Sequence, residues 1–152
     1  MIYTDLTCKA MKLAYDAHHG QTDKSGLPYI FHPFHLAEQM TDEITVCIAL
    51  LHDVAEDTDI TIAELEKEFP VEVTEALKLL THDKNTDYFD YIRKIKESPA
   101  ASVVKLADLR HNSDISRLRN EQVRSSEKTA ERTEKYRKAI EILTDNCRKK
   151  SM

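Results

Sequence analysis

Four side chains that can bind a metal or move a proton lie within a stretch of six residues. They are His52, Asp53, Glu56 and Asp57. On an α-helix each residue advances by about 100°, so these four positions fall within an arc of about 140°. The spacing therefore predicts that they face one side of a helix.

The segment that carries them is otherwise apolar. Residues 44–55 place isoleucine, valine, alanine and leucine around nearly the whole helix, which predicts a centrally buried element. Buried acids and imidazoles are costly unless a cation or hydrogen bonds compensate them. A divalent metal would do so, and this donor set suits Mn, Fe, Co or Zn better than a structural thiolate site does. The alternative is that His52 and Asp53 only cap or solvate the helix end.

A second polar group interrupts another apolar stretch. Residues 103–108 read VVKLAD, which places Asp108 beside a buried face. Lys105 lies three residues before it and Asn112 four residues after it, so both share its helix face. We interpret Asp108 as a further metal ligand, and we expect His111 near the same pocket.

The elements that must position these groups are helices. Only two glycines and four prolines occur in 152 residues, so few positions force a turn. A loop from Gly20 to Pro33 is expected to deliver His32 to the start of a helix. The sequence predicts an all-α, single-domain bundle over residues 1–152, with helices at about 4–19, 34–40, 44–55, 61–69, 71–80, 87–96, 100–118 and 121–149.

Charge and cysteine content narrow the classes of partner. The formal net charge of -5 provides no basic field for nucleic acid. The three cysteines are widely spaced and fit neither a disulfide framework nor a zinc finger, which is typical of a reduced, cytoplasmic protein. No apolar run approaches the ~20 residues of a membrane span, so we expect neither a signal peptide nor membrane binding.

Three ordered motifs together resemble a known family. Gly26–Pro33 reads GLPYIFHP, Leu50–Asp57 reads LLHDVAED, and Val104–Asp108 reads VKLAD before His111 and Asn112. The order H…HD…D is similar to the HD superfamily. More narrowly, the motifs resemble the hydrolase domain of RelA/SpoT proteins and of free-standing small alarmone hydrolases, over about residues 6–118.

The resemblance implies an activity and a cofactor. It implies removal of the 3′-diphosphate from guanosine tetra- or pentaphosphate, with Mn²⁺ as the usual metal. The metal ligands it implies are His32, His52, Asp53 and Asp108. Because the expected ligands form three clusters from separate helices and the sequence shows no second set, we expect one metal per chain.

It also implies roles for residues around the metal. Glu56 and Asp57 match the acidic pair that activates water and protonates the leaving ribose oxygen. Lys24, Lys105 and Asn112 match positions that contact the phosphorylated nucleotide. Because no synthetase domain follows, the sequence predicts hydrolysis only.

Two positions depart from the family pattern. The family usually carries an arginine that packs on guanine just before the lysine, where this chain has Asp23. The family also commonly reads Arg-Leu-His-Asn after the last ligand, whereas here Leu109 precedes Arg110. We therefore expect weakened guanine recognition, which Asp23→Arg should restore by lowering KM.

Two other functions stay open at this point. One is an HD-type hydrolase of another nucleotide, such as a phosphorylated dinucleotide cofactor or a nucleoside monophosphate. The other is a non-enzymatic metal or nucleotide sensor, which the presence of both Glu56 and Asp57 disfavours. The sequence also leaves open whether the chain forms a homo-oligomer.

Overall fold

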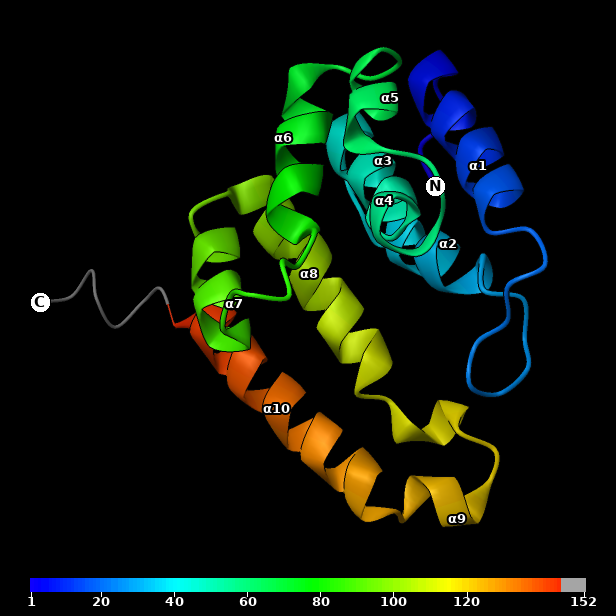
Figure 1. Ribbon diagram of the computed structural model, residues 1–152. Coiled ribbons are helices and arrows are strands. Elements are labelled where there is room, and N and C mark those ends of the chain that lie inside the picture. Colours follow the sequence, from blue (N-terminus) through cyan, green and yellow to red (C-terminus); the bar gives the residue numbers. More distant parts are fainter. Residues whose placement is uncertain (146–152) are drawn as a thin grey trace, which may run out of the picture.

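The computed structural model describes residues 1–145, which form helices and loops with no strand among them (Figure 1). This confirms the all-α prediction. The helices are α1 (Asp5–Ala17), α2 (Phe31–Glu38), α3 (Glu43–Leu51), α4 (Val54–Asp57), α5 (Ile62–Glu66), α6 (Val71–Leu80), α7 (Tyr88–Lys96), α8 (Pro99–Asn112), α9 (Glu121–Arg124) and α10 (Glu127–Thr144), with a 3-10 turn at Ile115–Arg117. None of these helices has the length and apolar character that a membrane span requires.

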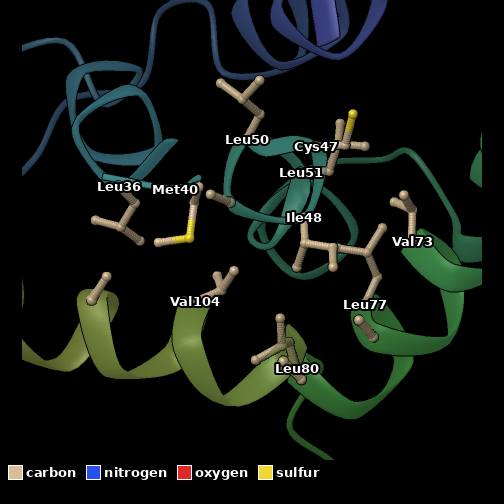
Figure 2. Packing of buried hydrophobic residues seen from close by; sticks show 14 of the residues in the cluster. Leu36, Met40, Cys47, Ile48, Leu50, Leu51, Val73, Leu77, Leu80 and Val104 are labelled. Carbon is tan, nitrogen blue, oxygen red and sulfur yellow. The ribbon is translucent and has the colours of Figure 1, made fainter. Parts of the chain in front are cut away.

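Helix α3 lies at the centre of the fold and packs against α1, α2, α6 and α8. Every residue from Thr45 to Leu51 is buried, as its uniformly apolar sequence predicts. Figure 2 shows Ile48 of α3, Leu77 of α6 and Val104 of α8 among the side chains of this core. Each such side chain contributes about 1.5–3 kcal/mol through burial. The core therefore fixes the C-terminal end of α3, where the HD pair begins.

The predicted helix over 44–55 is wrong at its end. Helix α3 stops at Leu51, and α4 begins at Val54. His52 and Asp53 form the connecting turn, and the carbonyl of Asp53 accepts a hydrogen bond from the Asp57 amide at 2.9 Å. His52 and Asp53 therefore lie on a turn and the two acids on a short helix, rather than all four on one continuous helix.

The loop between α1 and α2 folds back on itself. Gly20 and Gly26 have φ values of 87° and 81°, in the left-handed region that favours glycine. An antiparallel bridge joins Thr22 to Pro28, and the Tyr29 amide donates to the Gln21 carbonyl at 2.9 Å. Helix α2 then begins at Phe31, three residues earlier than predicted, with His32 in its first turn. The structure confirms that the loop delivers His32 to a helix start.

The C-terminal half contains two more differences from prediction. The helix predicted over 100–118 ends at Asn112 and is followed by the 3-10 turn. The helix predicted over 121–149 is divided into α9 and α10, because the Ser126 hydroxyl caps the amide of Thr129 and starts a new helix. Residues 146–149 of that prediction lie outside the described residues. Helix α10 packs against α7 and α8 (Figure 1).

Candidate metal centre and substrate pocket

Four predicted ligands come together from three parts of the fold. His32 lies on α2, His52 and Asp53 lie between α3 and α4, and Asp108 lies on α8. The ligand atoms of His32, His52 and Asp53 are within 4.8 Å of one another. Asp108 Oδ1 is 2.9 Å from His32 Nε2 and 3.6 Å from His52 Nε2. The fold thus gathers two imidazoles and two carboxylates around one point.

Hydrogen bonds behind the two imidazoles turn one nitrogen of each toward that point. His52 Nδ1 donates to the Ala49 carbonyl at 2.6 Å, which leaves Nε2 as the free nitrogen. Nε2 is buried and makes no hydrogen bond with any residue that the structure describes, although Asp53 Oδ2 lies 3.0 Å away. A metal-binding histidine typically shows this arrangement, with its other nitrogen bonded to a carbonyl or carboxylate.

His32 is oriented by another histidine. Its Nδ1 lies 2.7 Å from Nδ1 of His111, and the two rings are parallel to within 5°. Burial, reinforced by the positive charge of Arg117, lowers the pKa of His111 to about 4, so its ring is neutral and can accept a hydrogen bond. His32 Nδ1 therefore donates to His111, and His32 Nε2 points to Asp108 Oδ1 at 2.9 Å, on the side of the ring that faces the cluster. This confirms the expectation that His111 lies beside the site.

The carboxylates of the cluster are held in their charged form. Burial by itself would raise the pKa of Asp108, but Lys105, His32 and His52 outweigh it and hold the pKa well below its ordinary value. Burial also acts to raise the pKa of Asp53. The charge and hydrogen bond of His52 and the hydrogen bond of the Tyr29 hydroxyl outweigh it and lower the pKa. Carboxylate oxygens beside imidazole nitrogens form a donor set that divalent transition metals accept. The residues present therefore fit a divalent metal.

Glu56 and Asp57 lie beside this cluster on α4. Both carboxylates are open to solvent, yet enough protein surrounds them that burial raises the pKa of each, and the nearby Asp53 charge adds to it. Glu56 Oε1 accepts a hydrogen bond from the His82 amide at 3.0 Å, which fixes that side chain. Solvent-open carboxyls with raised pKa values next to a metal site are suited to exchange protons with water.

A pocket of about 320 Å³ opens beside His32 and Tyr29. One wall is the loop at residues 22–25, a second is the segment 112–118 after α8, and the third is α10 from Thr129 to Tyr136. Lys24 and Asn112 line it, as the family resemblance implies. Burial lowers the pKa of Lys24, and the positive charges of Arg132 and Lys128 lower it further. Crowded cations of this kind favour an anionic ligand.

Two pocket arginines escaped the sequence interpretation. Arg117 follows α8 in the 3-10 turn, and Arg132 lies on α10, and both line the pocket. The signal was weak, because isolated arginines in polar segments read as surface charges. The polar stretch of α10 before its apolar stripe was the available clue, since that stretch faces the pocket.

Lys105 has a different position from the other predicted substrate contacts. Its ammonium lies 2.9 Å from Asp108 Oδ2 and over the ring of Tyr91 at 5.5 Å from the centroid. Lys105 is not among the residues that line the pocket. Burial lowers its pKa, but Asp108 raises it above the ordinary value, so the side chain stays charged. Lys105 therefore neutralises and orients Asp108.

Asp23 has a structural task within the loop. Its Oδ1 accepts hydrogen bonds from the amides of Ser25 at 2.8 Å and Leu27 at 3.0 Å. Its Oδ2 lies 3.7 Å from Arg117 Nη2, across the pocket rim. The Ser25 hydroxyl adds a hydrogen bond to the Arg117 carbonyl at 2.6 Å. The anion that departs from the family pattern thus shapes the loop and pairs with an arginine.

Comparisons with known proteins agree with this geometry. The HD domain model matches residues 10–101. The bifunctional (p)ppGpp synthase/hydrolase SpoT of Escherichia coli is 39% identical over 119 residues, which cover 68% of this chain and 17% of that protein. A guanosine-3′,5′-bis(diphosphate) 3′-pyrophosphohydrolase of Mus musculus is 38% identical over 101 residues, covering 59% of this chain and 56% of that protein. This chain therefore spans a small part of the bacterial relative and little more than half of the mouse one.

A solved structure gives wider coverage. It is described as a metazoan orthologue of SpoT that hydrolyses ppGpp. The TM-score is 0.70 at 28% sequence identity, over 96% of this chain and 87% of that one. The likeness extends through α10, beyond the residues that the family model matches. With its motifs gathered as described and a family match over more than half of its length, the chain belongs to the HD domain family.

Proposed function

We propose that the protein is a metal-dependent phosphohydrolase that removes the 3′-diphosphate from guanosine tetra- or pentaphosphate. The observation that carries this proposal is that the candidate metal centre adjoins a pocket lined by cations. The His and Asp cluster borders a pocket whose other walls carry Lys24, Arg117 and Arg132. A nucleotide with phosphates at two positions needs both a hydrolytic centre and a separate set of cations. The names of the relatives support the choice of substrate.

We assign one divalent metal to each chain, held by His32, His52, Asp53 and Asp108, and propose Mn²⁺ as its identity. When bound, such a metal polarises the phosphoryl group and lowers the pKa of a water molecule. Lys105 keeps Asp108 anionic and oriented through the 2.9 Å contact. Asn112 adds a hydrogen bond to Asp108 Oδ1 at 3.0 Å, and its position at the pocket lets it contact the nucleotide as well.

The acidic pair supplies the proton transfers. Water adds to the phosphorus atom that is bonded to the 3′-oxygen. The bond between this phosphorus and the 3′-oxygen then breaks, which releases pyrophosphate. Glu56 takes a proton from the water, because its raised pKa makes it a better base than an ordinary glutamate and His82 holds it in place. Asp57 delivers a proton to the departing 3′-oxygen, since its own raised pKa lets it carry one.

The cations on the far side of the pocket bind the phosphates that do not react. Arg117 and Arg132 can each form charge-assisted hydrogen bonds with phosphate oxygens. Lys24 adds a third positive charge from the wall formed by the loop at residues 22–25. We further propose that residues 1–152 work as one domain, since buried side chains from α1 to α10 belong to one apolar cluster.

A second candidate keeps the chemistry and changes the base. Asp23 occupies the position where the resembling family carries a guanine-packing arginine, so another phosphorylated nucleotide could be preferred. The Asp23 contacts favour this candidate only weakly, because Arg117 brings a guanidinium to the same rim. A sensor without activity is disfavoured by the solvent-open acidic pair.

Turnover of a nucleotide panel tests the proposal. The purified protein with Mn²⁺ is offered guanosine tetraphosphate, its adenosine analogue, a phosphorylated dinucleotide cofactor and a nucleoside monophosphate. Released pyrophosphate and phosphate are measured separately. We expect pyrophosphate from guanosine tetraphosphate at the highest kcat/KM. Release of phosphate alone, or a preference for another nucleotide, would replace the proposed substrate with the second candidate.

A further inference from the structure

His18 is a buried histidine close to the acidic pair. Its position at the end of α1 suggests a surface cation that favours the helix dipole, but the side chain is only 2% exposed. It lies against Tyr29, with ring centroids 4.9 Å apart, and Tyr29 in turn bonds Asp53. His18 is therefore part of the layer beneath the proposed metal centre.

A hydrogen-bond chain links His18 to the segment that carries Asp57. His18 Nδ1 lies 2.8 Å from Gln21 Oε1, and Gln21 Nε2 donates to the Asp57 carbonyl at 2.9 Å. Because a carbonyl can only accept, this second bond fixes which end of the Gln21 amide is the donor. Gln21 Oε1 must then accept from His18, so the proton lies on Nδ1.

The remaining nitrogen of His18 has no partner. Nε2 is buried and forms no hydrogen bond with any residue from 1 to 145. A buried polar atom in this state costs about 1–3 kcal/mol, which a nearby partner would recover. None of the hydrogen bonds among the described residues involves the Asp57 carboxylate, and that side chain is open to solvent.

The two unpartnered groups are neighbours. Among the attractive charges around Asp57, that of His18 lowers its pKa more than that of His52 does, although burial is the largest influence and raises it. Gln21 already bonds both residues, so they are held close together. An exposed side chain changes rotamer within nanoseconds, so the Asp57 carboxyl group samples positions directed toward His18.

We propose that His18 is a positioning residue that holds Asp57 through a hydrogen bond between its Nε2 and one carboxyl oxygen. One proton lies between the two groups, whichever of them carries it, so the bond forms in either state. The other carboxyl oxygen is then directed to the 3′-oxygen of the substrate. The inference rests on the proposed function, because Asp57 takes part in that reaction.

Two substitutions test the two ring nitrogens of His18 one at a time. In His18→Asn the amide lies near the former Nδ1, so the bond to Gln21 survives and the Nε2 contact is lost. In His18→Gln the amide reaches the former Nε2 position, so the bond to Gln21 is lost and the Nε2 contact survives. With guanosine tetraphosphate, we expect His18→Asn to lower kcat at least tenfold and His18→Gln to retain more of it. KM and metal content should stay within about twofold of the wild type.

The order of the two variants decides between positioning and support. If His18→Asn keeps the wild-type kcat, or exceeds His18→Gln, then His18 serves only to hold Gln21 and the proposal is overturned. A loss of kcat that merely follows a loss of metal or of melting temperature overturns it too.

A second measurement does not depend on turnover, so it also separates this inference from the proposed function. The ¹⁵N resonance of His18 Nε2 is recorded by NMR in the metal-free protein. We expect it to shift in Asp57→Ala and to stay in place in the matched Glu56→Ala, whose carboxylate bonds His82 instead. An unchanged resonance in Asp57→Ala overturns the inference, even if the enzyme hydrolyses guanosine tetraphosphate. A shifted resonance supports it even if that nucleotide is not turned over.

Discussion

The two sides of the pocket are built in different ways. The proposed metal-binding side is buried, comes from α2, the turn after α3 and α8, and is held by internal hydrogen bonds such as that of His52 to the Ala49 carbonyl. The opposite side comes from a loop, a 3-10 turn and the polar face of α10, and it is open to solvent. The comparison teaches that the buried core holds the residues proposed for the reaction, while the surface elements hold those proposed for nucleotide binding.

Loss of a metal ligand should have the largest effect. We expect His52→Ala and Asp108→Ala to lose the one bound metal and all measurable turnover, because each removes a donor from the cluster. Asp108→Ala also leaves Lys105 buried without its partner, which costs about 3–5 kcal/mol of stability. Metal analysis, turnover and thermal unfolding test this, with the exposed His19→Ala as control. Wild-type metal content in both variants would sink the ligand assignment.

Loss of the proposed base comes next. Glu56→Gln preserves shape and its bond to His82 but cannot take a proton, so turnover should fall about a hundredfold to ten-thousandfold. Metal content and KM should remain at wild-type values, since the interaction matters chiefly in the transition state. The exposed Asp59→Asn is the matched control. Normal turnover of Glu56→Gln would move the base to another residue.

The surface side should respond through binding rather than through chemistry. Removing a charge-assisted hydrogen bond costs about 1.5–3 kcal/mol, so Arg132→Ala should raise KM about tenfold to a hundredfold with kcat nearly unchanged. Arg137→Ala is a control on the same helix, because Arg137 pairs with Glu134 and Glu141 and does not line the pocket. A fall in kcat with unchanged KM would show that Arg132 contributes to the chemical step rather than to binding.

The smallest effect is expected at Asp23. Asp23→Asn keeps an oxygen for the Ser25 and Leu27 amides and removes only the charge beside Arg117. An ion pair this open is worth at most about 1 kcal/mol, so stability should change little and KM by less than about fivefold. Asp83→Asn, which alters a similar turn remote from the pocket, is the control.

Asp23→Arg, in contrast, removes both loop hydrogen bonds. The structure therefore changes the sequence-based expectation, since the loop contacts favour a higher KM rather than a lower one. Steady-state kinetics with guanosine tetraphosphate measures the sign. A lower KM in Asp23→Arg would show that position 23 faces the base and that the loop tolerates the change.

The sequence predicted the all-α fold and the helices that bear the ligands, because apolar periodicity and helix caps are local signals. The helix predicted from residue 61 is one example, since Thr61 and Glu64 form a capping box at its start. The break at His52 and Asp53 could not be predicted, because the backbone stays near helical values there and the sequence carries no glycine or proline.

Long-range contacts set the other limit of prediction. The pairing of Lys105 with Asp108 agrees with its spacing, but the contact of Asp23 with Arg117 joins distant segments and has no local signal. The burial of His18 has no local signal either, since it depends on contact with Tyr29 across a loop. Contacts within one helix can be predicted from residue spacing, whereas contacts between segments joined by a loop have no such local signal.

The hydrogen bond between Ser25 and the Arg117 carbonyl joins residues 92 positions apart. During synthesis the chain emerges from its N-terminus, so this rim of the pocket can close only after residue 117 has left the ribosome. Asp108, the last of the proposed metal ligands, emerges earlier. This rim of the pocket is therefore completed late in synthesis, after most of the buried core residues have already emerged.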